Sequence, residues 1–326
     1  MAISTVKATV NGQEVTLTLN SSTGKYEATL TAPTASSNSL AAGYFPVSIT
    51  ATDTAGNSTT IDHTHGTFGN SLKLYTTEKV NPTISVTAPG AGSYSTSATP
   101  SLSFTASDKG TQTTGFSGFD TSAAWLSITL DGTAKSGAGL SDILSGISST
   151  PASANAAGYY GEVAYSAAFK SLSDGQHTAV ITVTDKDGNT ASVTRTFTVD
   201  TVRPELTGVA VNSDTGSSIE TNTKALTITG TASDVTGGTP TVTITVDGTD
   251  QGTVTVGNGG AFSKAITVST DGTYTIVVTA TDAAGNSTSV TKTVTVDTSA
   301  PVFTSVTISA QSGDAGRTYT ISVSVS

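Results

Sequence analysis

The chain has 326 residues, enough for about two to four domains. Hydrophobic residues make up 35% and charged residues only 12%, so uncharged polar residues and glycine dominate, a balance that disfavours helical bundles and charged disordered tails. The formal charge of −10 would repel a phosphate backbone and disfavours nucleic-acid binding. Cysteine is absent, which excludes disulfides, zinc–cysteine clusters and thiol catalysis.

Neither an export signal nor a membrane-spanning segment is visible. The opening MAISTVKATV lacks the basic segment and apolar stretch of a secretory signal, and nowhere do 18 or more apolar residues run together. We therefore expect no membrane insertion. A chain of this kind that works outside a cell must leave by another route, such as lysis, or must have been cut from a longer precursor.

The first predicted strand covers residues 6–13, in which apolar and polar residues alternate. It matches the third strand of a later repeat at residues 241–249, and residues 24–30 match the fourth strand of that repeat at residues 261–268. Nothing before them supplies the first two strands. We therefore expect residues 1–66 to form an incomplete unit.

A hairpin follows the first of three equivalent aspartates, Asp53, Asp185 and Asp282. Before each aspartate apolar residues alternate with mostly Thr or Ser, which indicates a strand with one buried face. After each come Gly-Asn and, in the later copies, a clear second alternating run, which predicts the closing strand of a hairpin. A repeat of about 100 residues suits a β-sandwich. Residues 67–80 are then a linker.

Residues 81–200 are predicted to form a complete sandwich with an insertion at about residues 134–162. The predicted strands before its closing hairpin are 81–89, 100–108, 125–133 and 165–169. The insertion contains a short helical segment, residues 140–147. A loop carried by only one repeat is where recognition usually lies, so Tyr159 and Tyr160 are predicted to contact a sugar or a protein surface; the alternative is that they cover an enlarged core.

Residues 201–298 are predicted to form another complete sandwich, and residues 299–326 a two-stranded segment. The predicted strands before the closing hairpin of the sandwich are 202–211, 225–234, 241–249 and 261–268. Two strands alone are marginal in water, and a sandwich without two of its strands exposes part of its core.

The two ends of the chain therefore need complementary pieces. One hypothesis is that residues 299–326 of one molecule complete the unit of residues 1–66 in the next, by addition of strands to an open edge. Such head-to-tail assembly gives a filament, or a ring if the rotation closes. The alternatives are a window trimmed from a longer repeat array, a different partner chain, or partial domains that stand alone.

The repeats resemble bacterial immunoglobulin-like units of phage virion proteins and large surface adhesins. The resemblance rests on TATDTAGNS, TVTDKDGNT and TATDAAGNS, on the closing TFTVD and TVTVD, and on the following VRP and SAP. It implies an all-β fold of tandem Greek-key sandwiches with incomplete units at both termini. It also implies a structural protein, and the methionine start without an export signal favours a virion part over an adhesin.

Aspartates are predicted to gather where one unit meets the next, and Ca²⁺ favours six to eight oxygen ligands. The predicted ligands are Asp200, Asp234 and Asp282 at one joint, and Asp108, Asp185 and Glu78 at the preceding one. The resemblance supports calcium, because family members that stiffen their joints with it use such aspartates. The alternative is that each Asp before Gly-Asn accepts backbone hydrogen bonds within its own turn.

His63 and His65 flank Thr64, so on a strand they would share one face and could offer nitrogens to a transition metal in an oligomer. The alternative is that His65 packs against the core. His177 stands near the corner where sandwiches often place a tyrosine, and is predicted to be structural.

We predict that the chain is not an enzyme. Six glutamates, three histidines and no Gly-x-Ser-x-Gly motif leave little from which to build a general acid or a nucleophile. The predicted function is that of a structural component of a phage tail or other virion part, and the alternative is a spacer fragment of a bacterial surface adhesin. The expected partners are other assembly proteins, further copies of the chain and, through the insertion, a cell-surface glycan.

Overall fold

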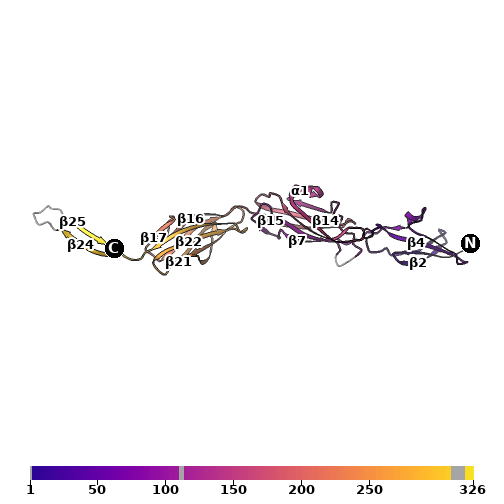
Figure 1. The fold of residues 1–326 in the computed structure, drawn as a ribbon, viewed down its shortest axis with the longest axis horizontal. Helices are drawn as coiled ribbons and strands as arrows, with labels where there is room; N and C mark the ends of the chain where they lie inside the picture. The colour runs from indigo at the N-terminus through magenta and orange to yellow at the C-terminus, as the bar shows by residue number, and fades with distance from the viewer. Residues whose placement is uncertain (1, 110–113, 310–319) are drawn as a thin grey trace. The chain divides into compact units, whose positions relative to one another are not determined.

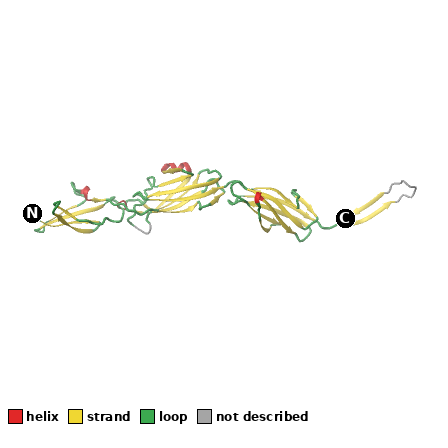
Figure 2. Ribbon diagram, turned by 180° about the vertical axis from the view of Figure 1, so that it is seen from behind, coloured by secondary structure: helices red, strands yellow, loops and turns green. Residues whose placement is uncertain are grey.

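The computed structural model describes residues 2–109, 114–309 and 320–326. The fold is all-β, and its helical segments are short and lie outside the sheets (Figure 2). The chain divides into two compact units, Met1–Asp200 and Thr201–Ser326. Both are built mainly from antiparallel strands, as the alternating Val, Ile and Thr residues predict.

The first part of the chain forms a single sheet, here called the N-terminal sheet, with strand order β3-β2-β1-β4-β5 and β6 paired with β4. Its elements are β1 (Ile3–Val10), β2 (Gln13–Asn20), β3 (Lys25–Glu27), η1 (Ser37–Ser39), β4 (Phe45–Asp53), β5 (Ser58–Ile61), η2 (Gly69–Leu72) and β6 (Lys73–Leu74). β1 lies in the middle of the sheet, between β2 and β4.

One face of the N-terminal sheet is apolar. The register places these residues on that face: Val6, Ala8, Val10, Val15, Leu17, Val47, Ile49, Ala51 and Ile61. Only Val6 among them is buried. Within residues 2–80 no second sheet lies over this face, so its apolar side chains stay partly in contact with water.

Residues 24–30 form less of a strand than their match to residues 261–268 predicts. Only Lys25–Glu27 forms a strand, and it pairs with β2 in the N-terminal sheet. In the later repeat the equivalent strand, β21 (Ala261–Thr267), pairs with β18 (Ala225–Ser233). Within residues 2–80 the structure has no counterpart of β18, so residues 24–30 have no second-sheet partner there to pair with.

Residues 83–199 form the second sandwich, whose sheets have the orders β12-β13-β9-β7 and β11-β10-β14-β15-β8. Its elements are β7 (Thr83–Ala88), β8 (Ser93–Ser95), β9 (Ser101–Ser107), β10 (Leu126–Leu130), β11 (Thr133–Ser136), η3 (Gly137–Gly139), α1 (Leu140–Ile143), β12 (Leu144–Ala154), β13 (Tyr160–Phe169), β14 (Gly175–Thr184) and β15 (Thr190–Val199). Phe119, Phe169 and Phe197 are the largest fully buried side chains of its core.

The insertion adds an edge strand to the second sandwich. The expected short helix is present but ends at Ile143, and the residues after it form β12, which pairs with β13. Because β12 lies at the sheet edge, most of its side chains remain exposed. Pro151 on this edge makes it a poor template for pairing with another chain.

Residues 205–296 form the third sandwich, from the sheets β16-β18-β21 and β17-β23-β22-β19-β20. Its remaining elements are β16 (Glu205–Val211), β17 (Ser218–Thr221), β19 (Thr241–Val246), β20 (Thr249–Val254), η4 (Asn258–Gly260), β22 (Gly272–Thr281) and β23 (Ser287–Val296). Its core contains apolar residues of both sheets.

The C-terminal ribbon consists of β24 (Phe303–Ser309) and β25 (Thr320–Val325), which among the described strands pair only with each other (Figure 1). Its apolar side chains are largely exposed: Val306 is 59%, Ile308 63% and Ile321 65% accessible. A two-stranded ribbon has no second layer against which to bury them.

Candidate metal centre

Three of the predicted calcium ligands come together within the first compact unit. One carboxylate oxygen from each of Glu78, Asp108 and Asp185 lies within 4.8 Å of the others, and all three residues are buried. Asp108 follows β9 and Asp185 follows β14, so both stand at the same end of the second sandwich. The segment that enters this sandwich carries Glu78. We call these three residues the carboxylate cluster.

Asp185 accepts hydrogen bonds within its own turn, which was the alternative to calcium binding in the sequence analysis. The backbone N–H of Asn189 donates to Asp185 Oδ1 at 2.8 Å, and the Asn189 side chain donates to Oδ2 at 2.8 Å. The same pair of bonds joins Asp53 to Asn57 and Asp282 to Asn286. The shared aspartate therefore builds its own hairpin, and its further lone pairs remain for a ligand.

Asp108 is only half satisfied. Its Oδ2 accepts hydrogen bonds from the Gly118 N–H at 2.6 Å and the Ser117 hydroxyl at 3.2 Å. Its Oδ1 is buried and has no hydrogen-bond partner. A buried carboxylate oxygen without a partner is costly, and a bound cation would remove that cost.

Glu78 shares its partners with the other two carboxylates. Its Oε2 accepts from the Val80 N–H at 2.6 Å, and its Oε1 lies 3.2 Å from Ser117 Oγ and 3.1 Å from Asn189 Nδ2. Ser117 has one hydroxyl proton, so it donates to Glu78 or to Asp108 but not to both at once. In the described residues no Lys or Arg forms an ion pair with the cluster.

Glu78 and Asp108 resist ionisation. Burial, opposed in part by the Val80 N–H and assisted by the charge of Asp108, raises the pKa of Glu78 to about 7. Burial, with the nearby charge of Asp185, raises the pKa of Asp108 to about 6. The donor set consists of hard oxygens, which suits Ca²⁺ better than a transition metal.

Asp187 is a neighbour of the cluster that the sequence analysis did not assign. Its Oδ2 accepts from the Glu78 N–H at 2.8 Å, and its Oδ1 accepts from Asn38 Nδ2 at 2.7 Å. Both other hairpins carry alanine at this position, Ala55 and Ala284. This difference between otherwise similar repeats is the sequence feature that could have identified Asp187.

The second predicted set of ligands falls in both compact units. Asp234 and Asp282 lie in the second unit, with carboxylate oxygens within 4.8 Å of each other. Asp234 Oδ1 accepts the backbone N–H groups of Thr236 and Gly237. Asp200 ends the first unit, where its N–H donates to Ser95. The convergence of all three aspartates remains a prediction.

The two histidines do not share the face of a strand, because β5 ends before them at Ile61. The Asp62 side chain accepts from the backbone N–H and the hydroxyl of Thr64, which folds the chain into a turn. His65 Nδ1 then accepts from backbone N–H groups, and the His63 ring packs beside Tyr44. The strand geometry on which the metal prediction rested is therefore absent.

Tyr159 and Tyr160 are half-buried rather than exposed. The ammonium of Lys186 lies 4.7 Å from the ring centre of Tyr159. Tyr160 packs against the core of the second sandwich. His177 is buried, with its ring nitrogens 2.7 Å from Asp131 and 2.8 Å from the Ser173 carbonyl oxygen, so it holds the sandwich corner together.

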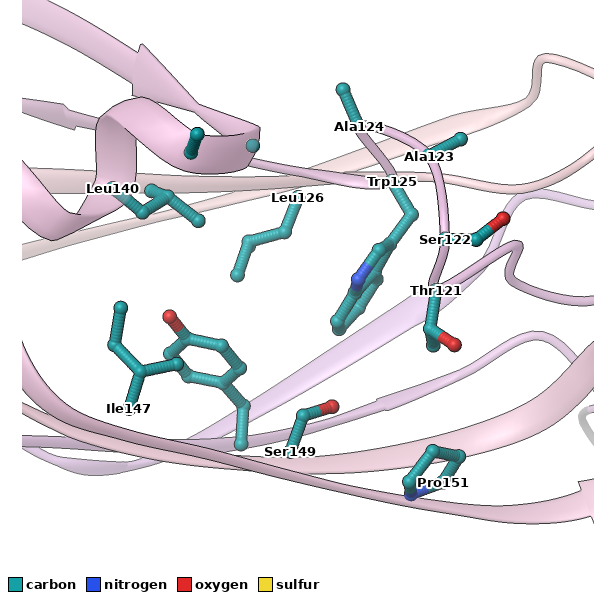
Figure 3. Close-up of a pocket in the computed structure, with 13 residues that line it drawn as sticks. Thr121, Ser122, Ala123, Ala124, Trp125, Leu126, Leu140, Ile147, Ser149 and Pro151 are labelled. Carbon is teal, nitrogen blue, oxygen red and sulfur yellow. The ribbon is translucent and has the colours of Figure 1, made fainter.

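The insertion borders a cavity of about 560 Å³ in the second sandwich. Side chains of Trp125, Leu126, Leu140 and Ile147 point into a common space there (Figure 3). Tyr165 also lines it, and the buried Tyr165 hydroxyl has no hydrogen-bond partner. All residues lining the cavity are uncharged.

Family models match most of the chain. One, described as a bacterial Ig-like domain, matches residues 114–201 and 202–298, more than half of the sequence. The chain belongs to the bacterial Ig-like domain family. A second model with the same description matches residues 2–70. No curated protein matches this bacterial Ig-like chain.

Solved structures with a similar fold include repeats of bacterial adhesins. Tandem repeats from the extending region of a large adhesion protein share 18% identity over 98% of this chain and 79% of theirs, with a TM-score of 0.30. A 1.5-MDa bacterial ice-binding adhesin shares 19% over 91% and 88%, with a TM-score of 0.27. Fibronectin(III)-like modules of Clostridium thermocellum CbhA share 16% over 66% and 94%, with a TM-score of 0.37. Likeness at this level carries no functional assignment.

The residues matched as bacterial Ig-like domains contain most of the described strands. Within the described residues, no helix combines the length and the apolar character needed to cross a membrane.

Proposed function

We propose that this chain is a structural spacer of an extracellular assembly, a phage tail or other virion part. In this proposal its first bacterial Ig-like unit is completed by strands from a neighbouring polypeptide. The alternative setting is a bacterial surface adhesin in which the units hold a binding tip away from the cell. Mass spectrometry of purified virions and of cell-surface fractions separates the two, because the chain should be found in one and not in the other.

The open apolar face of the N-terminal sheet is the observation that carries the proposal. In the third sandwich the equivalent strands, β19 and β22, bury all but one of the same positions completely, the exception being the half-buried Val246. Burial of apolar surface stabilises a fold by about 25 cal/mol per Å², and a half-exposed apolar face lacks part of this stabilisation. It therefore favours an acceptor role, in which strands from a neighbour replace the missing sheet.

Hydrogen exchange tests the acceptor role. In dilute solution the amides of β1 and β4 should exchange faster than those of β19 and β22, because sheets without a packed core open more readily. Protection of β1 and β4 should rise to the level of the third sandwich once the chain is part of its assembly. Equal protection of both pairs of strands in the dilute chain would contradict the proposal.

A second role is calcium binding by the carboxylate cluster. The unpartnered Oδ1 of Asp108 favours it, together with three buried carboxylates that no Lys or Arg neutralises in the described residues. Glu78 precedes the second sandwich, whereas Asp108 and Asp185 lie within it. An ion held by all three would fix the entering segment to the sandwich and stiffen the spacer at this joint.

Glycan contact is the third role, and the cavity beside Trp125 is a better site for it than Tyr159 and Tyr160. Its wall combines aromatic rings, small hydroxyl side chains and no charge, which suits a neutral sugar ring. On a glycan array the intact assembly should bind neutral glycans, and Trp125→Ala should lose the signal. Absence of binding by the folded wild-type chain would remove this role.

A further inference from the structure

The C-terminal ribbon has the pairing of the first two long strands of the third sandwich. Each hairpin contains one irregularity in register, and on both sides of it equivalent residues face each other. The equivalent pairs are Leu206–Ala232 and Val211–Ile228 in the sandwich, and Phe303–Val325 and Ile308–Ile321 in the ribbon. The ribbon is therefore the counterpart of β16 and β18.

The two hairpins differ in what covers them. Val211 and Ile228 are fully buried in the third sandwich, whereas Ile308 and Ile321 are 63% and 65% exposed. The ribbon thus presents the apolar side of a half-sandwich without the sheet that normally lies against it. Exposed apolar surface of this kind marks an interaction site.

The N-terminal sheet is the matching other half. Its strands β2-β1-β4-β5 stand in the same order as β20-β19-β22-β23 of the third sandwich. The registers also agree, since Ala8 faces Ile49 where Ile244 faces Val278. In the third sandwich these two positions pack under the sheet that contains β16 and β18. What the N-terminal sheet lacks is the element that the ribbon supplies.

The described strands of the ribbon carry no charged residue and no proline. Natural edge strands that must not pair are usually protected by charges, prolines or bulges, and the ribbon has only its one irregularity in register. An uncharged ribbon also meets no electrostatic penalty when it approaches an apolar sheet face. Both properties favour a strand donor.

We propose that the C-terminal ribbon of one copy completes the N-terminal sheet of a second copy. This inference rests on the proposed acceptor role of that sheet and names its partner. Ile308 and Ile321 of the donor would take the places of Val211 and Ile228, over Ala8 and Ile49 of the acceptor. Because the two surfaces differ, the contact is heterologous, and repetition gives a filament or a closed ring.

A pair of full-length variants tests the contact. Ile308→Asp disables the donor and leaves the acceptor intact, and Ile49→Asp does the reverse. We expect the wild-type mass to grow with concentration in sedimentation velocity, and each variant alone to stay monomeric. An equimolar mixture of the variants should form a complex of two copies and no larger species, because each copy retains one working surface.

The control is Thr320→Asp, whose equivalent in the third sandwich, Thr227, faces solvent. It should associate like the wild type. Circular dichroism checks folding, and Ala8→Asp replaces Ile49→Asp if that variant loses its strand signal. Association of Ile308→Asp at the wild-type level, or a mixture that stays monomeric, would overturn the inference.

Failure of the inference and failure of the acceptor role give different results. One result would be a wild-type chain that is monomeric at about 100 μM, which means that the dissociation constant for self-association is weaker than that concentration. If the amides of β1 and β4 are also unprotected, a second copy is excluded as the donor. That result would leave the N-terminal sheet as an acceptor for another polypeptide. Protected amides in the monomer would exclude both.

Discussion

Replacing Ile228 by aspartate should unfold the third sandwich, whereas the same replacement at Ile321 should leave the melting of the dilute chain unchanged. The two residues occupy equivalent strand positions, but Ile228 is fully buried and Ile321 is 65% exposed. Burying an unpaired carboxylate and losing a core side chain together cost more than about 4 kcal/mol. The free energy of unfolding of a single domain is only about 5–15 kcal/mol, so a loss of this size is large enough to unfold the third sandwich.

Differential scanning calorimetry of the full chain measures this difference. The transition of the third sandwich should disappear or fall steeply in Ile228→Asp and remain in Ile321→Asp. Ile228→Val is the matched control for side-chain size, with an expected cost of about 0.5–1.5 kcal/mol. Equal destabilisation by aspartate at both positions would mean that the ribbon is buried in the dilute chain, contrary to the exposure of its side chains.

The strands of the two complete sandwiches could be predicted because their signals are local. Alternation of period two defines a one-sided strand, and the Asp-x-x-Gly-Asn turn carries its own hydrogen bonds, as Asp185 and Asn189 illustrate. The opening strand at residues 83–88 also lies inside its predicted range. These features need no knowledge of the rest of the chain.

Elements whose form depends on a distant partner could not be predicted. β12 has the sequence LSGISSTPASA, which lacks alternation, and it is a strand because β13 offers an edge. Residues 24–30 have a strand-like pattern, yet only three of them pair, because the second sheet they would join is missing. In both cases tertiary pairing overrides local preference.

The carboxylate cluster was predictable in part. Glu78, Asp108 and Asp185 follow from the repeat, which places the ends of equivalent strands together. Ser117 and Gly118, which hold Asp108, lie in an irregular loop whose path no sequence period defines. The position of His63 could not be predicted either, because Asp62 accepts a hydrogen bond from the Thr64 N–H and so forms a turn where the sequence predicted a strand.

Calcium should stabilise the second sandwich. The variant Asp108→Asn should be less stable than the wild type when calcium is bound and more stable than the wild type when calcium is absent. At free Ca²⁺ of about 100 times the dissociation constant, binding to the folded state contributes about 2.7 kcal/mol. The variant loses an anionic ligand and so loses this stabilisation. Without calcium, at pH 8, it should melt higher than the wild type, because a neutral amide replaces a buried charge that lacks a compensating cation.

The pH dependence of the calcium-free wild type provides an independent check. The pKa values of Glu78 and Asp108 are raised from 4.5 and 3.8 to about 7 and 6. The folded chain therefore binds more protons than the unfolded chain between these limits, and stability falls as pH rises through them. Lowering the pH from about 8 to about 6 should raise the melting temperature of the second sandwich by several degrees.

Thermal unfolding with Ca²⁺ or with a chelator, at both pH values, measures both effects. Saturating calcium should remove most of the pH dependence, because the bound ion keeps the carboxylates ionised. Glu162→Gln is the control, since Glu162 pairs with Lys109 at 2.7 Å on a more exposed surface and should change little. A melting temperature of the wild type that is indifferent to calcium, together with an Asp108→Asn variant that is less stable under every condition, would leave the cluster as a purely structural turn.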